Sequence, residues 1–284
     1  MNGAKIKILE LFGGIGACSK ALEMLEIDYE ITDYIEIDKF AVLSFNTMHN
    51  TSFEPQDICK WDKDLKNIDL IMHGSPCQDF SLAGKLAGGD QNSGTRSSLM
   101  YETIRIVSKI KPKYIIWENV KNVISQRHRH NFDNYINSLD ELGYANYYQV
   151  LNAKDYGIPQ NRERIFVVSI RKDVNKTFEF PEKKILTLTL KDLLENEVDT
   201  KYYLSDEQFK KDYLINTLDV NSKVDFLKIK NATKKGYIEA YEGDSVNLQY
   251  PNSSTRRGRV GKQVSQTIQC NDMMGVVINK RFAN

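Results

Sequence analysis

The chain has 284 residues, of which 41% are apolar and 27% charged, and its formal net charge is +1. This composition is ordinary for a globular protein and excludes a chain that is disordered throughout, because enough apolar side chains are present to bury a core. No apolar run approaches the roughly 18 residues of a membrane-spanning helix and no secretion signal opens the chain, so we expect one or two domains in the cytoplasm.

Short β-rich runs alternate with helical patterns along the first 170 residues. The expected strands are Ile6–Leu11, Ile31–Ile35, Ile68–Met72, Tyr114–Trp117 and Ile165–Ile170. The expected helices are Ala17–Leu25, a helix that opens at Phe40–Phe45, Ser98–Ile110, which Pro112 ends, and Phe132–Leu142. This alternation predicts an α/β fold with a Rossmann-like, mostly parallel sheet. Sheets of this kind place their chemistry in loops at the carboxyl ends of the strands.

The amino-acid composition and the strand–helix pattern change near Val174. Lys, Glu, Asp and Asn dominate from there and the alternation is lost, so we expect a catalytic domain over residues 1–174 and a smaller region over 175–284 with little parallel sheet. From Ser245 to Asn284 there are six Lys or Arg and one Asp, a local charge of +5. The other residues, with 33 of the 39 basic and 37 of the 38 acidic side chains, carry −4. A basic tail on a slightly acidic body is compatible with a polyanion partner.

A glycine turn follows the first expected strand, in the sequence Phe12-Gly13-Gly14-Ile15-Gly16. Glycines at this place let the backbone approach a ligand closely. Glu36 lies about 20 residues further on, at the end of the second expected strand, where an acid can bind ribose hydroxyls. The pair fits an adenosine-containing ligand, although a tight turn and an unrelated surface acid would read the same way.

Two further strand ends carry reactive side chains. Cys77 lies in the loop Gly74–Ser81 after the third expected strand, where a nucleophile would stand, and an unperturbed thiol has a pKa of about 8.5. Glu118 ends the fourth expected strand, and a carboxyl that leaves a hydrophobic strand can be partly desolvated, which favours proton donation. A buried structural cysteine and a loop acid are the alternatives.

A pair of arginines precedes the last expected strand, in Gln160-Asn161-Arg162-Glu163-Arg164. Alternate residues of an extended segment face one side, so Arg162 and Arg164 can point together at an anion or a polar base edge. Ordinary surface arginines are the alternative.

The four cysteines, at positions 18, 59, 77 and 270, do not form a CxxC metal pair. We therefore expect no metal site, and for the cysteines other than Cys77 the role of small buried hydrophobes.

In order and spacing, these segments resemble the FGGIG, PCQ, ENV and QxRxR motifs of the cytosine-C5 DNA methyltransferase family, over residues 5–172. The resemblance implies the fold of methyltransferases that use S-adenosylmethionine, and a bacterial or phage restriction–modification system. The cofactor contacts that it implies are Phe12, Gly13, Gly14, Ile15, Gly16, Glu36, Ile37, Asp57, Ile58, Pro76 and Leu99.

The resemblance also implies a mechanism. The Cys77 thiolate attacks C6 of a flipped cytosine, Glu118 holds or protonates N3, and C5 then takes the methyl group. Arg164 would bind the cytosine carbonyl, and Arg162 would support the site or contact phosphate. The product cofactor is S-adenosylhomocysteine.

DNA recognition in this family maps to about residues 175–250 and to a later basic motif, Arg256–Ile268. The expected DNA contacts are Gln78, Ser81, Arg256, Arg257 and Arg259. The local basic excess falls in this motif and supports double-stranded DNA as the partner.

The family's Gly-Asn-Ser/Ala-Val signature and closing C-terminal helix are not found in the chain. A truncated product, a split enzyme completed by a second polypeptide, and a fold without full activity are the three explanations. We expect weak cofactor affinity and exposed apolar surface near Ile6–Leu11. Two other functions stay open: a tRNA cytosine-C5 methyltransferase, against which the long 175–265 region argues, and a subunit that binds DNA or a partner without catalysis.

Overall fold

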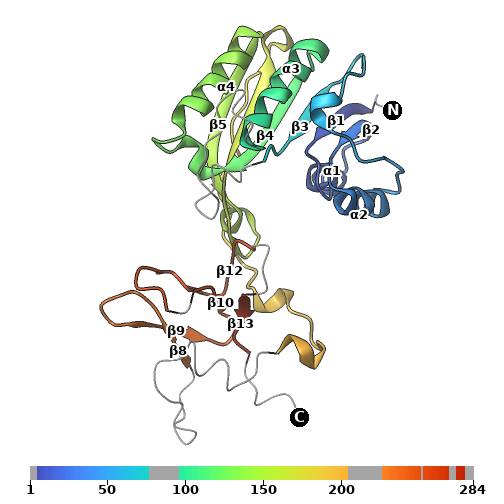
Figure 1. Cartoon of the computed structure of the whole chain (residues 1–284). Coiled ribbons are helices and arrows are strands. Elements are labelled where there is room, and N and C mark those ends of the chain that lie inside the picture. Colours follow the sequence, from blue (N-terminus) through green and yellow to red (C-terminus); the bar gives the residue numbers. More distant parts are fainter. Residues whose placement is uncertain (1–4, 77–95, 204–225, 251, 269–272, 279–284) are drawn as a thin grey trace, which may run out of the picture. The chain divides into compact units, whose positions relative to one another are not determined.

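The computed structural model describes residues 5–76, 96–203, 226–250, 252–268 and 273–278. The chain forms two compact units, one of residues 1–151 with 163–181 and one of residues 152–162 with 182–284 (Figure 1). The sequence-based boundary at residue 174 differs from this division mainly because the short segment 152–162 belongs to the second unit.

The described residues of the first unit form a six-stranded sheet and four α-helices. The strands are β1 (Ile6–Leu11), β2 (Tyr29–Ile35), β3 (Leu70–His73), β4 (Tyr114–Val120), β5 (Tyr144–Asn152) and β7 (Glu163–Arg171). The helices are α1 (Ala17–Met24), α2 (Lys39–His49), α3 (Met100–Ile110) and α4 (Arg129–Glu141). All the expected strands and helices are present. One strand that the sequence did not predict, β5, forms an edge of the sheet.

The strand order is β2-β1-β3-β4-β7-β5. β1 pairs in parallel with β2 and with β3, β3 pairs in parallel with β4, and β4 pairs antiparallel with β7. The predicted α/β class with a largely parallel sheet is therefore confirmed. The carboxyl ends of β1 to β4 and the start of β7 all lie at the same end of the strands. Folds of this kind bind their ligands at that end.

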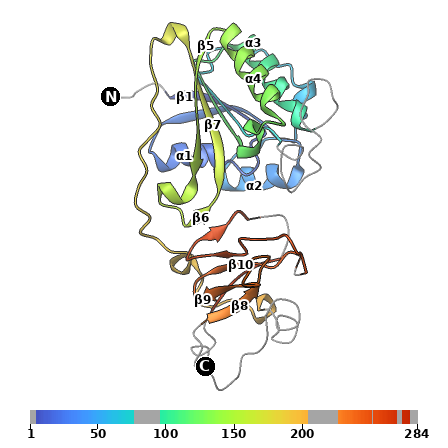
Figure 2. The same ribbon diagram turned by 90° about the vertical axis from the view of Figure 1, so that its left-hand side faces the viewer.

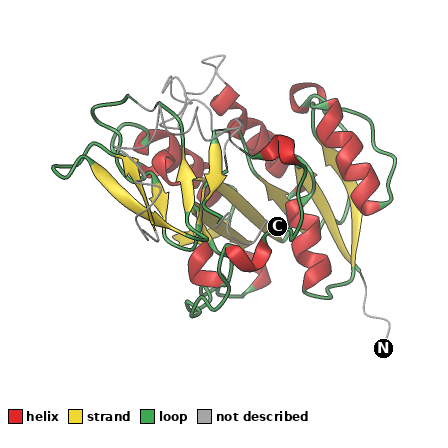
Figure 3. Ribbon diagram, turned by 90° about the horizontal axis from the view of Figure 1, so that it is seen from below, coloured by secondary structure: helices red, strands yellow, loops and turns green. Residues whose placement is uncertain are grey.

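Helices lie on both faces of this sheet (Figure 2, Figure 3). Successive side chains of a strand point to opposite faces, so each strand serves two cores. The core under α3 and α4 holds Leu9, Leu11, Ile71, Ile115 and Trp117 from the sheet. The core under α1 holds the alternate residues Ile8, Leu70 and Met72. Each such buried aliphatic side chain contributes about 2 kcal/mol.

The strand Ile6–Leu11 is not itself the exposed apolar surface expected near it. Ile8, Leu9 and Leu11 are fully buried, because β1 lies between two strands and is packed on both faces. Exposed apolar side chains of the first unit occur instead on and beside α1 and α2, where Met24 and Phe40 are 75% and 69% exposed.

The second unit is built from short strands. They are β6 (Gln160–Asn161), β8 (Phe226–Lys230), β9 (Tyr237–Tyr241), β10 (Ser245–Asn247), β11 (Val260–Gly261), β12 (Ser265–Gln266) and β13 (Met274–Val276). β8 pairs antiparallel with β9, and β10 pairs antiparallel with β11 and β13. β6 and β12 form the one parallel pair among the described strands of this unit. None of the helices in the described part of the chain has the length and apolar composition needed to cross a bilayer.

Candidate active site

The turn after β1 requires its glycines. Gly14 and Gly16 have φ of 54° and 85°, in the left-handed region that side chains with a Cβ rarely adopt. A Cβ on Gly13 would lie 2.5 Å from the ring of Tyr34, and a Cβ on Gly16 would collide with His49 and Phe45. The backbone can thus pass close to β2 and α2. Beyond Gly14 there is open space on the side where a Cβ would point.

Glu36 joins this turn to the end of β2. Its carboxylate accepts hydrogen bonds from the backbone N–H of Gly14 at 3.1 Å, of Ile37 at 2.8 Å and of Asp38 at 2.9 Å. The sequence-predicted pair of a glycine turn and an acid therefore forms one local structure, held by bonds from three amides.

The segment that contains Asp57 and Ile58 lies beside Glu36. The backbone N–H of Gln56 donates to the Glu36 carbonyl oxygen at 2.8 Å, and Asp57 caps a single 3-10 turn, η1 (Ile58–Lys60), by accepting from Cys59 N at 3.0 Å. The Ile58 side chain is 4% exposed and belongs to the main core.

Two more residues with a predicted cofactor role are described. Leu99 precedes α3 and packs against the core that contains Ile58, and Pro76 is half-buried after β3.

The loop after β3 is described as far as Pro76. Cys77, Gln78 and Ser81 lie outside the described residues. Ser75, buried at 4% exposure, accepts a hydrogen bond at Oγ from Trp117 Nε1 at 3.0 Å. The Asn119 side-chain amide donates to the Ser75 carbonyl and to its Oγ, each at 3.2 Å. The chain that leads toward residue 77 is thus held by two residues of β4.

These two contacts were missed by the sequence reasoning, which singled out only Glu118. The signal was available, because Trp117 and Asn119 flank Glu118 and so share the opposite face of an extended segment. That face is buried, with Trp117 and Asn119 each 1% exposed.

Glu118 projects from β4 beside this loop. Arg164 Nε lies 2.9 Å from Glu118 Oε1, and the two side chains are 16% and 30% exposed respectively. The antiparallel register pairs Val120 with Arg164, which brings the start of β7 next to the end of β4. Glu118 Oε2 lies 3.7 Å from the place of a Cβ on Gly74. The carboxylate and the segment before Cys77 are therefore neighbours.

Arg162 and Arg164 lie where β6 gives way to β7. β6 ends at Asn161 and β7 begins at Glu163, and the N–H of Arg162 bonds the Gln160 carbonyl at 3.1 Å. The same N–H also donates to Asn152 Oδ1 at 3.1 Å, and Arg162 and Arg164 are both half-buried while Asn161 and Glu163 are exposed. Arg162 belongs to the second unit and Arg164 to the first.

Of the three arginines expected to contact DNA, Arg259 has another position. It is 1% exposed, and its guanidinium donates to the carbonyl oxygens of Asn247 at 3.1 Å, Gln249 at 2.7 Å and Tyr250. A buried arginine held by backbone oxygens supports the fold, so the expectation of a phosphate contact is corrected. Arg257 is exposed and Arg256 half-buried.

The surroundings of two other cysteines of the first unit do not favour the thiolate form. Burial, followed by the charges of Glu10 and Glu118, raises the pKa of the Cys18 thiol to about 12. Burial and nearby acids also raise the pKa of Cys59. Neither thiol is activated as a nucleophile, since activation requires a lowered pKa.

Glu10 is a buried acid beneath the glycine turn. It is 1% exposed, and burial raises its pKa to about 7 despite a hydrogen bond donated by Ser19 Oγ. The sequence reasoning treated it only as part of a strand.

Comparison with known families places these segments in context. The family model for C-5 cytosine-specific DNA methylases matches residues 6–279. The chain belongs to this family. The four motifs and their order predicted this membership, and the match confirms it.

The relatives of this methylase are methyltransferases by name. The chain is 35% identical to the type II methyltransferase M2.ScrFI of Lactococcus lactis subsp. cremoris over 78% of each chain. It is 34% identical to the orphan methyltransferase M.SPRI of Bacillus phage SPR over 72% of this chain, but spans only 53% of that protein.

Solved structures agree on the fold. DNMT2 of Spodoptera frugiperda aligns with a TM-score of 0.61 at 21% identity, over 90% of this chain and 73% of its own. A putative DNA modification methyltransferase encoded within a prophage in E. coli aligns with a TM-score of 0.57 at 23% identity, over 69% and 57%. At these identities the likeness shows the shared fold.

Proposed function

We propose that this chain transfers a methyl group from S-adenosylmethionine to C5 of a cytosine flipped out of a specific duplex DNA sequence, within a bacterial or phage modification system. Cys77 is the proposed nucleophile. The observation that carries the proposal is the position of Glu118, which Arg164 holds beside Gly74, three residues before Cys77. Family membership and the names of the relatives support DNA as the substrate.

The glycine turn and Glu36 fit an adenosine-containing cofactor. A carboxylate offers about four lone-pair sites, and backbone N–H groups take three of those on Glu36, so acceptor capacity remains for a ribose hydroxyl. Ile37 is 68% exposed next to it and offers an apolar surface to a purine. We assign the cofactor to Phe12–Gly16, Glu36, Ile37, Asp57 and Ile58, with Pro76 and Leu99. When bound, S-adenosylmethionine supplies an electrophilic methyl group on a sulfonium.

The chemistry assigned to the chain's own residues is covalent catalysis. The Cys77 thiolate forms a bond to C6, and the electron pair of the C5–C6 double bond moves toward C5, which becomes nucleophilic. Glu118 holds a proton against N3, so negative charge does not accumulate on the ring, and Arg164 donates to the ring carbonyl. After methylation, loss of the C5 proton restores the double bond and expels Cys77 as thiolate.

The DNA contacts that we retain are Arg256 and Arg257 of the second unit, with Gln78 and Ser81 near the nucleophile and Arg162 as a support or phosphate contact. Arg257 Nε donates to the Ala232 carbonyl at 3.1 Å, which orients an exposed guanidinium on the surface. A cytosine inside a duplex is out of reach of a thiol, so base flipping is part of the proposal.

Mechanism-based trapping tests this function. A duplex with 5-fluorocytosine at the target position blocks the last step, because fluorine cannot leave in place of the C5 proton. Incubation with S-adenosylmethionine should give a covalent protein–DNA adduct that is lost in Cys77→Ala and kept in Cys270→Ala, a cysteine to which no part of the proposed site is assigned. An adduct that survives Cys77→Ala would refute the assignment of the nucleophile. Methyl transfer to tRNA but not to DNA would refute the assignment of the substrate.

A further inference from the structure

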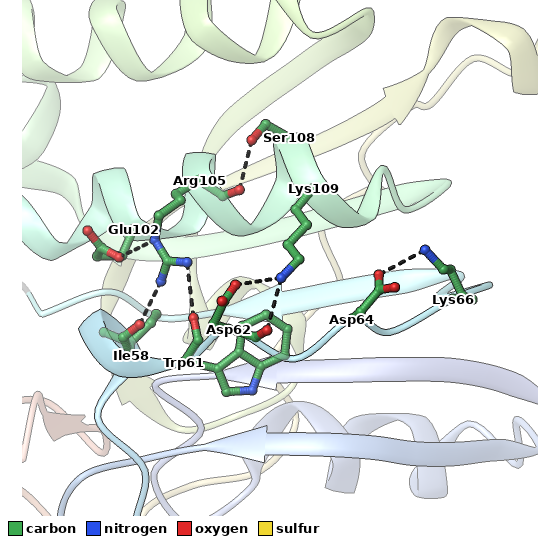
Figure 4. A network of polar contacts seen from close by, with 9 residues as sticks. All are labelled: Ile58, Trp61, Asp62, Asp64, Lys66, Glu102, Arg105, Ser108 and Lys109. Atoms are coloured by element: carbon green, nitrogen blue, oxygen red, sulfur yellow. Dashed lines mark hydrogen bonds and ion pairs between the residues drawn. The ribbon is translucent and has the colours of Figure 1, made fainter.

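A polar network on α3 holds the segment that contains Asp57 and Ile58 (Figure 4). Arg105 of α3 donates from Nη2 to the Ile58 carbonyl at 2.8 Å and from Nη1 to the Trp61 carbonyl at 3.0 Å. Its third bond, from Nε to Glu102 Oε2 at 2.7 Å, fixes the guanidinium on its own helix. The Arg105 side chain therefore hydrogen-bonds the backbone at both ends of the turn η1.

The opposite side of the same segment is attached to β2. Trp61 Nε1 donates to the Asp33 carboxylate at 2.7 Å, and the Gln56 side chain donates to Asp33 at 3.0 Å and to the Tyr34 carbonyl at 2.7 Å. Asp33 is 3% exposed. Hydrogen bonds thus attach the segment 56–61 to α3 on one side and to β2 on the other.

These contacts matter because the segment has little regular structure of its own. Between the end of α2 and the start of β3, η1 is the one helix or strand in the described chain. The Ile58 carbonyl accepts the turn's own bond from Trp61 N at 3.2 Å, so Arg105 reinforces this carbonyl and supplies a donor from α3 to the Trp61 carbonyl that follows the turn. Arg105 supplies such donors in a planar fork, a geometry that lysine cannot reproduce.

The segment is also hydrogen-bonded to Glu36, the residue proposed to bind the ribose. Gln56 N donates to the Glu36 carbonyl, and the Glu36 carboxylate accepts from Gly14. Hydrogen bonds and chain continuity therefore connect Arg105, η1, Glu36 and the glycine turn. A binding site needs its contact residues held within about 0.5 Å, and the supporting side chains provide that precision.

We infer that Arg105 is a positioning residue for the cofactor site: it sets the place of Asp57 and Ile58 relative to Glu36, and so determines affinity for S-adenosylmethionine without touching it. The inference rests on the proposed cofactor site. It concerns affinity for the cofactor and leaves DNA binding to other residues.

The test compares Arg105→Ala and Arg105→Lys with Lys109→Ala in the full chain. Lys109 lies one turn further along α3, and its hydrogen bonds in Figure 4 go to the carbonyl and carboxylate of Asp62 in the same loop and not to Ile58 or Trp61. Calorimetry with S-adenosylhomocysteine gives Kd, filter binding gives the DNA affinity, and hydrogen exchange follows the amides of residues 58–61.

The expected result is a Kd about tenfold higher for Arg105→Ala, because two carbonyl bonds are lost. We expect an intermediate Kd for Arg105→Lys, no change for Lys109→Ala and unchanged DNA affinity in all three. Exchange at residues 58–61 should rise with Kd in the Arg105 variants. If Arg105→Ala does not fold, Arg105→Lys decides by the same criteria.

Three outcomes would overturn the inference, and the measurements distinguish them. Binding by the unchanged chain with the same Kd in the Arg105 variants would overturn the positioning role and leave the proposed function intact. Failure of the unchanged chain to bind the cofactor product would overturn the proposed cofactor site, and the inference with it. Equal losses of cofactor and DNA affinity would also overturn it, because they indicate general unfolding.

Discussion

Glu10 makes the stability of the first unit depend on pH in an unusual direction. Its pKa is raised by burial from 4.5 to about 7. Between these values the folded chain binds a proton that the unfolded chain has released, so stability falls as pH rises. One pKa unit corresponds to about 1.4 kcal/mol, so a rise of roughly 2.5 units costs about 3 kcal/mol above pH 7 and almost nothing at pH 4.

The substitution Glu10→Gln tests this pH dependence, because it keeps the shape of the side chain and removes its charge. Ser19 Oγ can still donate to the amide oxygen. The surroundings of the side chain, namely Gly13, Ser19 and Cys18, supply no cation in the described contacts that could stabilise the carboxylate. The variant should therefore gain stability relative to the natural chain as pH rises, by about 3 kcal/mol between pH 4 and 8.

Urea unfolding at a series of pH values, followed by tryptophan fluorescence, measures this difference. The chain has two tryptophans, and both Trp61 and Trp117 are buried in the core of the first unit. Glu30→Gln, an exposed acid on the neighbouring strand β2, is the matched control and should show no such trend. A stability difference between Glu10→Gln and the natural chain that stays constant with pH would refute the reasoning.

Four other substitutions test the site and the second unit. Glu118→Gln should lower kcat by about 100-fold or more with DNA affinity changed less than threefold, as general acid catalysis requires; equal losses in both would mean a structural role. Gly13→Ala should weaken binding of S-adenosylhomocysteine at least tenfold in calorimetry, because the new Cβ meets the Tyr34 ring at 2.5 Å; an unchanged Kd would contradict the close approach. Arg259→Ala should destabilise the second unit by about 3 kcal/mol, since three carbonyl oxygens lose a charged donor. Arg257→Ala should instead weaken DNA binding in a salt-dependent manner and leave the melting temperature of the second unit unchanged.

The elements with a strong apolar period were predictable from the sequence. Four of the six residues of Ile6–Leu11 are apolar, because the strand packs against a core on each face, and such apolar-rich strands are typical of parallel sheets. β5 was missed for the opposite reason: Tyr148 and Gln149 are exposed on this edge strand, so no apolar run marks it.

The site was predictable where motif and chemistry coincide. The glycine turn, Glu36 and Glu118 could be named because their residue types and strand-end positions carry the chemistry. Arg259 was misassigned because a guanidinium is equally suited to a phosphate and to buried carbonyl oxygens, and only its burial distinguishes the two.

Local sequence alone determined the family, the alternation of strands and helices and the turn that needs glycine, since each depends on neighbouring residues or on short spacings. The tertiary structure decided which distant groups meet: Arg164 with Glu118, Asn119 with Ser75, and Arg105 with the carbonyls of η1. Those contacts join segments about 40 residues or more apart, and their geometry follows from strand order and packing, which no local pattern encodes.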